Sequence, residues 1–170
     1  MFKIEIITKR KIENFRGRCV LFNIHGIGIK SITKVDYSSL YFIDGNINIR
    51  EINKIASELL VDKIIEHYVI SLCNTKCDAK VVSKSCIKND NSDLNVSIVE
   101  VLYKDGVTDV ASESVLKAIQ DLGIVKKIEV KTGDKYYLYG NGISQNTLNV
   151  VIDKLLVNTL IQKYEINKFK

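Results

Sequence analysis

An internal repeat is the feature of this sequence that most constrains its fold. The segment from Leu59 to Ile70 reads LLVDKIIEHYVI, and the segment from Leu155 to Ile166 reads LLVNTLIQKYEI. Earlier in each copy, Val20-Leu21 pairs with Val115-Leu116 at an offset shorter by one residue. A loop between a helix and a strand tolerates such a difference. Two copies of one sequence unit predict two copies of one structural unit.

Hydrophobic periodicity predicts the same order of elements in both copies, strand-helix-strand-strand-helix-strand. In the first copy the predicted elements are strand 2–8, helix 15–25, strands 30–36 and 39–44 with a turn near Tyr37-Ser38 between them, helix 48–60 and strand 67–72. In the second copy they are strand 97–103, helix 109–122, strands 125–132 and 135–140, helix 144–157 and strand 163–166.

This β-α-β-β-α-β order is that of the ferredoxin-like fold. We therefore predict an α+β protein with ferredoxin-like repeats at residues 1–72 and 97–170, joined by a polar linker at residues 73–96. A sheet with helices on one face needs cover on its other face. The two repeats are accordingly expected to form a pseudo-symmetric dimer within one chain, and the chain to be a monomer.

The stretch from Ile98 to Ile124 is the best-formed part of the second repeat. A β-branched and aromatic run is followed by the turn Lys104-Asp105-Gly106, and then by Asp109 in a position to cap a helix. Gly123 follows the last apolar residue of that helix, where a left-handed C-terminal residue is common. The pattern predicts a strand, a tight turn and an amphipathic helix.

Charge and hydropathy exclude some classes of function. The net charge is +5, but the lysines are scattered along the chain, so nucleic-acid binding is not predicted. Every apolar run is much shorter than the roughly 20 residues of a transmembrane helix, so no membrane association is predicted. We expect a cytoplasmic protein.

The four cysteines are Cys19, Cys73, Cys77 and Cys86. Three of them could be part of a metal site, but no histidine lies near enough in sequence to complete four ligands. Reduced cytosolic thiols are the favoured interpretation, with Cys19 as a small core residue of a helix. No metal or cofactor site is predicted.

No catalytic motif is present: the sequence lacks a nucleophile elbow, a zinc-protease helix and a dinucleotide-binding fingerprint. The residues alone predict a tandem assembly or binding module. One form of it would be a regulatory module in which paired ferredoxin-like halves bind a small molecule.

The second repeat resembles the PurS family, the small component of phosphoribosylformylglycinamidine synthase in purine biosynthesis. The resemblance rests on the segment KDGVTD from Lys104 to Asp109, on the helix positions after it, and on the ending LLVN from Leu155 to Asn158. The first repeat is more divergent. Its Arg16-Gly17-Arg18 resembles a segment in the first copy of the tandem version found at the front of some large synthetases.

The resemblance implies a non-catalytic role in a ligase complex. In the family, a synthetase component uses ATP and magnesium, a glutaminase component releases ammonia from glutamine, and PurS bridges the two. No catalytic residue and no cofactor are then expected in this chain. The residues expected to contact a partner are Lys104, Asp105 and Asp109 of the turn.

Overall fold

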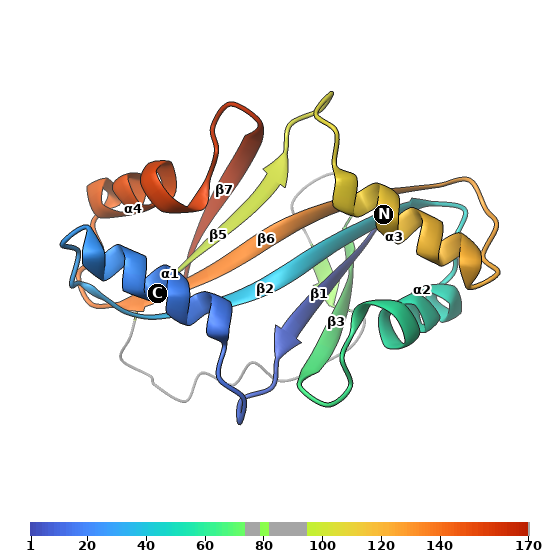
Figure 1. Ribbon diagram of the computed structural model, residues 1–170, viewed down its shortest axis with the longest axis horizontal. Coiled ribbons are helices and arrows are strands. Elements are labelled where there is room, and N and C mark those ends of the chain that lie inside the picture. The colour runs from blue at the N-terminus through green and yellow to red at the C-terminus, as the bar shows by residue number, and fades with distance from the viewer. Residues whose placement is uncertain (74–78, 82–94, 170) are drawn as a thin grey trace. The chain divides into compact units, whose positions relative to one another are not determined.

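The computed structural model describes residues 1–73, 79–81 and 95–169 of the chain. The elements of the first repeat are β1 (Phe2–Thr8), α1 (Phe15–Gly26), β2 (Ile32–Gly45), α2 (Ile49–Ile55), the π-helical turn η1 (Ala56–Leu60) and β3 (Glu66–Cys73), followed by the short strand β4 (Ala79–Val81). Those of the second repeat are β5 (Asn95–Tyr103), α3 (Val110–Asp121), β6 (Ile128–Gly140), α4 (Gln145–Val151), the π-helical turn η2 (Ile152–Leu156) and β7 (Gln162–Phe169). Figure 1 shows their course.

The chain forms two compact units, and each contains segments of both repeats. Unit 1 is made of the described residues of Met1–Ile12, Ser39–Cys86 and Thr108–Gly133. Unit 2 is made of those of Glu13–Ser38, Ile87–Val107 and Asp134–Lys170. Helix α1 of the first repeat therefore belongs to unit 2, and α3 of the second repeat belongs to unit 1.

In unit 1 the strand order is β4-β3-β1-β2-β6, with β1 and β3 antiparallel so that Ile4 lies opposite Ile70. Helix α3 contributes Ile119 to the same buried cluster as Ile4 of β1 and Ile52 of α2. The apolar helix face predicted from the sequence thus packs on strands from the other repeat.

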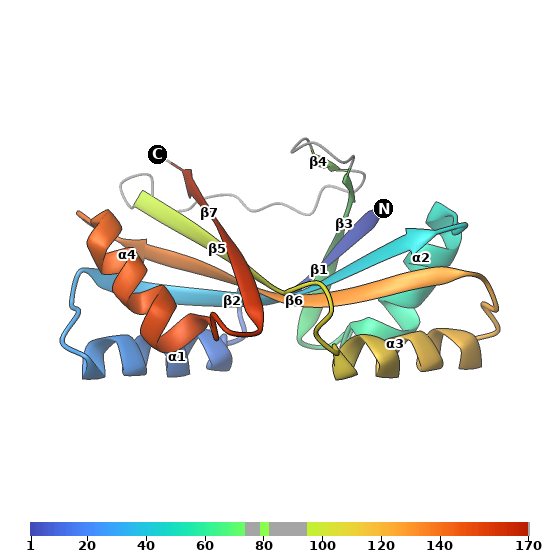
Figure 2. The same ribbon diagram turned by 90° about the horizontal axis from the view of Figure 1, so that it is seen from above.

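In unit 2 the strand order is β2-β6-β5-β7, with β5 and β7 antiparallel so that Val99 lies opposite Ile166. Helix α1 contributes Ile24 to the same buried cluster as Val99 of β5 and Leu148 of α4. In Figure 2, α1 and α4 are seen beside the strands of this unit.

In each repeat, the two middle strands that the sequence predicts are in fact one long strand. A turn was expected near Tyr37-Ser38 and another between residues 132 and 135, but β2 and β6 are each one continuous strand. The two units divide at these same places, between Ser38 and Ser39 and between Gly133 and Asp134. Each strand continues through the expected turn, and its two halves pack into different cores. On β2, Val35 lies in the core of unit 2 and Ile43 in that of unit 1.

The other predicted elements agree with the structure to within a few residues at their ends. The predicted linker, residues 73–96, lies mostly outside the described residues, but Ala79–Val81 within it pairs with β3. The polar composition of that stretch gave no sign of a strand. The α+β class with two ferredoxin-like repeats is confirmed.

Candidate partner interface

The turn after β5 holds two of the three residues predicted to contact a partner, Lys104 and Asp105, and both belong to unit 2. Asp109 belongs to unit 1, because the chain passes from one unit to the other between Val107 and Thr108. The structure therefore does not gather the three residues within one compact unit.

Lys104 fastens two loops of unit 2 together. Its backbone N–H donates to the carbonyl oxygen of Ile161 at 2.9 Å, and its ammonium donates to the carbonyl oxygen of Thr159 at 2.6 Å. Carbonyl oxygens of a loop accept these bonds without neutralising the charge. Lys104 is thus exposed and charged, with its side chain held in one place.

Asp105 is highly exposed to solvent, with 80% of its side chain accessible. Its carboxylate lies 3.5 Å from the ammonium of Lys163. An ion pair this exposed contributes at most about 1 kcal/mol. The ion pair between Asp105 and Lys163 therefore adds little to the stability of the fold.

Asp109 has a structural role. Its carboxylate accepts the N–H of Ser112 at 3.0 Å, which caps α3, and also the N–H of Thr132 at 2.8 Å. The hydroxyl of Thr132 donates to the same carboxylate at 3.0 Å. The cap that the sequence predicts is therefore present, and it also fixes the start of α3 against β6.

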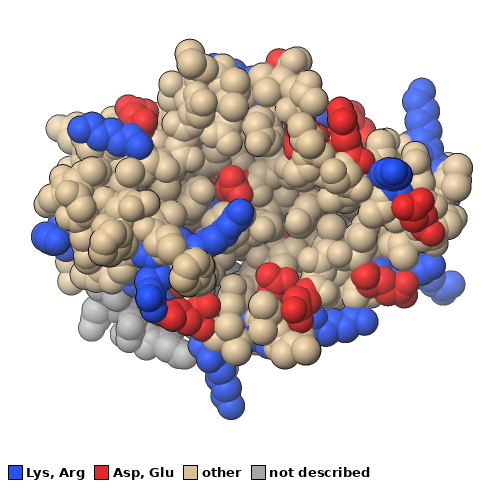
Figure 3. Space-filling model, in the orientation of Figure 1, with Lys and Arg blue, Asp and Glu red and all other residues tan. Residues whose placement is uncertain are grey.

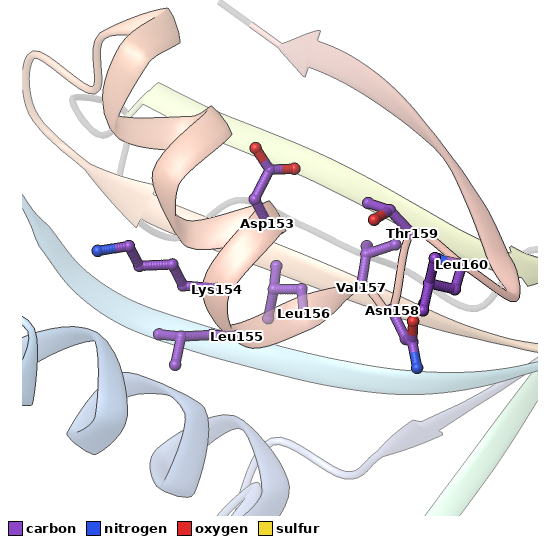
Figure 4. Close-up of a pocket in the computed structure, with 8 residues that line it drawn as sticks. All are labelled: Asp153, Lys154, Leu155, Leu156, Val157, Asn158, Thr159 and Leu160. Atoms are coloured by element: carbon purple, nitrogen blue, oxygen red, sulfur yellow. Dashed lines mark hydrogen bonds between the residues drawn. The ribbon is translucent and has the colours of Figure 1, made fainter.

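A pocket of about 490 Å³ opens beside the loop that Lys104 holds (Figure 4). Eight consecutive residues line it: Asp153, Lys154, Leu155, Leu156, Val157, Asn158, Thr159 and Leu160. The side chains drawn in Figure 4 spread outward from the end of η2 and do not converge on one point. Because the wall comes from one short segment, the pocket is open and does not enclose a small molecule.

The family comparison matches this half of the chain. Residues 96–170 match the model of PurS, described as phosphoribosylformylglycinamidine (FGAM) synthase. This part of the chain belongs to the PurS family. The family places it in FGAM synthase and in purine biosynthesis. No curated protein matches the sequence.

The first repeat lies outside the range of the PurS match, yet its loops make the same contacts. Lys9, at the place of Lys104, donates its N–H to the carbonyl oxygen of Ile65 at 2.8 Å. Its ammonium donates to the carbonyl oxygen of Lys63 at 2.5 Å. Asn14, at the place of Asp109, caps α1 by accepting the N–H of Gly17 at 2.9 Å.

The ends of the first helix in each repeat are also alike. Gly28 and Gly123 follow these helices with φ of 88° and 85°, a left-handed conformation that glycine adopts without strain. The next residue, Ile29 or Ile124, donates its N–H back into the helix at 3.3 Å in both cases. The first repeat therefore has the same local geometry as the second at these positions.

Arg16 and Gly17, the other positions of resemblance in the first repeat, pack α1 against strands of unit 2. The guanidinium of Arg16 lies over the ring of Tyr37, 4.7 Å from its centroid, and also donates to the Tyr37 hydroxyl. That hydroxyl donates to Asp134 of β6 at 2.6 Å. Beside it, burial and the charge of Asp134 raise the pKa of Tyr136 to about 12. Sequence reasoning missed this network because its members are far apart in the chain.

The cysteines form no site within the described residues. Cys19 lies on α1 as predicted, but it is exposed and not part of the core. The buried side of α1 carries Gly17 and Ile24, and Cys19, two positions after Gly17, points away from it. Cys73, at the end of β3, is not part of a disulfide, and Cys77 and Cys86 lie outside the described residues.

No cluster of three metal-ligating side chains occurs in residues 1–73, 79–81 and 95–169. Among the described helices, none is both long and apolar enough to cross a membrane. On the face shown in Figure 3, basic and acidic side chains are interspersed. This surface offers no continuous basic track of the kind that follows a nucleic-acid backbone.

Proposed function

We propose that this chain is a non-catalytic bridging component of FGAM synthase, which joins the ATP-dependent synthetase component to the glutaminase component. The observation that carries the proposal is the PurS match over residues 96–170. The matched half contains an exposed turn, Lys104-Asp105, whose conformation is fixed by bonds to the neighbouring loop.

The proposal takes the whole chain as a tandem PurS protein, with residues 1–72 as the first repeat and 97–170 as the second. The contacts of Lys9 and Asn14, which repeat those of Lys104 and Asp109, support a common origin of the two halves. A subunit with two similar halves has two similar surfaces to offer. That suits a protein that must hold two partners at once.

In this role the chain itself supplies no catalytic group, and ATP, magnesium and glutamine are used by the partner components. Its contribution is to orient the partners, so that ammonia released from glutamine reaches the synthetase before it escapes into water. Holding reacting partners in position replaces a bimolecular encounter by a local one.

The assembly itself tests the bridging role. Purified synthetase and glutaminase components that lack their own PurS partner are mixed with and without this chain and separated by analytical ultracentrifugation. The proposal predicts one species that contains all three proteins, and no stable synthetase–glutaminase species when the chain is left out. If the two components associate equally well without the chain, the bridging role is wrong.

A further inference from the structure

Each unit presents one pair of loops that Lys9 or Lys104 holds together. In unit 1 the pair consists of Lys9–Ile12 and Asp62–Glu66, and we call it the basic loop pair. In unit 2 it consists of Lys104–Val107 and Asn158–Gln162, and we call it the neutral loop pair.

The backbone of the two loop pairs is built in the same way. In the second loop, the side chain of Asp62 accepts the N–H of Ile64 at 2.8 Å, and that of Asn158 accepts the N–H of Leu160 at 3.1 Å. The N–H of Asp62 and that of Asn158 donate to the side chains four residues later, Glu66 and Gln162. These short internal bonds hold both loop tips in a defined shape.

Both tips point a large aliphatic side chain into solvent. Ile64 is 81% exposed and Leu160 is 84% exposed, and the residue after each of them, Ile65 or Ile161, is 39% exposed. Loop tips are ordinarily made of small or polar residues. Two adjacent exposed aliphatic residues on a loop of fixed shape form a small apolar patch that another protein could cover.

The charge of the two loop pairs differs. The basic loop pair carries Lys9, Arg10, Lys11 and Lys63 against Asp62 and Glu66. The neutral loop pair carries only Lys104 and Asp105, since polar uncharged residues replace the charged ones of its second loop. Arg10 and Lys11, at the tip of the first loop of unit 1, are both exposed.

We propose that the basic loop pair is a docking surface for a protein whose contact face is acidic around an apolar pocket, with Ile64 as the side chain that enters the pocket. The occupant follows from charge complementarity: Lys63 precedes the apolar tip in its own loop, and Arg10 and Lys11 lie in the loop that Lys9 joins to it. An acidic rim steers association and makes it dependent on ionic strength, while the buried tip supplies the affinity.

The inference rests on the proposed function, since it assigns one component of the complex to unit 1. It also explains how a subunit with two similar halves binds two different components. Partners with unlike surfaces are discriminated by charge, although the two loop pairs that receive them have the same backbone conformation. A protein is favoured over a nucleic acid because the surface is centred on an exposed aliphatic side chain, Ile64, whereas a phosphate backbone is contacted by charged and polar groups.

The test measures binding of the purified synthetase component and of the purified glutaminase component, separately, to the full chain by biolayer interferometry at about 50 and 200 mM salt, the range over which charge screening changes strongly. The variants are R10E/K11E and I64S. The matched control is K117E/K127E, which changes the net charge equally on exposed residues of unit 1 outside the loops.

The expected result is that one of the two components binds R10E/K11E and I64S at least tenfold more weakly, and that its binding to the natural chain weakens with salt. Binding of the other component, and of both components to K117E/K127E, stays within twofold. If both components bind R10E/K11E as tightly as they bind the natural chain, the docking surface is wrong and the proposed function still stands. If neither component binds the natural chain, both proposals fail.

A labelled DNA or RNA duplex serves as the remaining probe. If the natural chain binds the duplex at all at 200 mM salt, the R10E/K11E variant should bind it equally well. Duplex binding that is lost in this variant would contradict a protein partner at the basic loop pair. Circular dichroism and thermal melting of each variant show whether it is folded, and K63E is the second variant of the loop pair should R10E/K11E unfold.

Discussion

At the scale of single residues, the turn after β5 shows how a motif mixes exposed and structural positions. Its family resemblance could be read from the sequence, and so could the cap at Asp109. The bond from Asp109 to Thr132 could not, because it depends on where β6 passes. The sequence pattern likewise showed Lys104 as exposed but not the loop that it holds.

Asp109 and Asp105 differ sharply in their expected importance for the fold. Substitution D109A removes the cap of α3 and leaves the Thr132 N–H without its acceptor. The free energy of unfolding should therefore fall by about 2 kcal/mol. Substitution D105A, at an exposed ion pair, should change stability by less than about 0.5 kcal/mol. Urea denaturation of both variants measures the difference, and equal effects would contradict the assignment of Asp109 as structural.

Glu51 should make unit 1 sensitive to acid. Its carboxylate lies 2.8 Å from the ammonium of Lys126 and also accepts the N–H of Asn48, and both interactions lower its pKa. Because the folded pKa lies below the unfolded one, this contribution is complete above the ordinary pKa of the carboxyl and is lost as the pH falls. Melting of E51Q and the natural chain from pH 7 to pH 3 should show a difference at pH 7 that disappears in acid. The exposed-carboxylate variant E129Q is the control, and a difference that grows in acid would contradict the sign.

At the scale of elements, the sequence predicts where helices and strands lie but not which of them pack together. The expected turn at Tyr37-Ser38 is a place where the chain passes from one core to the other. Local composition cannot show this, because a strand that turns back and a strand that continues need the same apolar alternation. Ser38 is only 1% exposed, which also sets it apart from an ordinary turn residue.

Two glycines of α1 provide a test of how closely this helix approaches β2. Replacing a helical glycine by alanine usually stabilises by up to about 1 kcal/mol. At Gly26 an added Cβ meets nothing within 4 Å, so G26A should follow this rule. At Gly17 it would collide with the carbonyl oxygen of Val35, so G17A should destabilise by about 1–3 kcal/mol. Thermal melting compares the two variants, and a stabilised G17A would contradict the packing of α1.

At the scale of the whole molecule, each compact unit depends on both repeats. Ile24 and Ile119 lie in cores whose strands come largely from the other half of the sequence. Neither half therefore contains a complete set of the elements that bury its apolar residues. The repeat was visible in the letters, whereas the exchange of helices between the halves required the structure.

Cleavage of the chain between the two repeats tests whether the fold needs both repeats but not a continuous chain. If a protease site is placed between residues 82 and 94, the two fragments should stay associated after cleavage and melt cooperatively. Separated, neither should behave as a folded monomer with the melting temperature of the intact chain. Size-exclusion chromatography and differential scanning calorimetry measure this, and a stable monomeric fragment would contradict the composition of the units.

FGAM formation by synthetase and glutaminase components that lack a PurS partner, measured with and without this chain, tests the bridging role at the level of the reaction. With glutamine as the nitrogen source, we expect little product without the chain and restored product when it is present in stoichiometric amount. With an ammonium salt as the nitrogen source, the synthetase rate should not depend on the chain. Folded, matched components that make no more product from glutamine when the chain is added would contradict the claim.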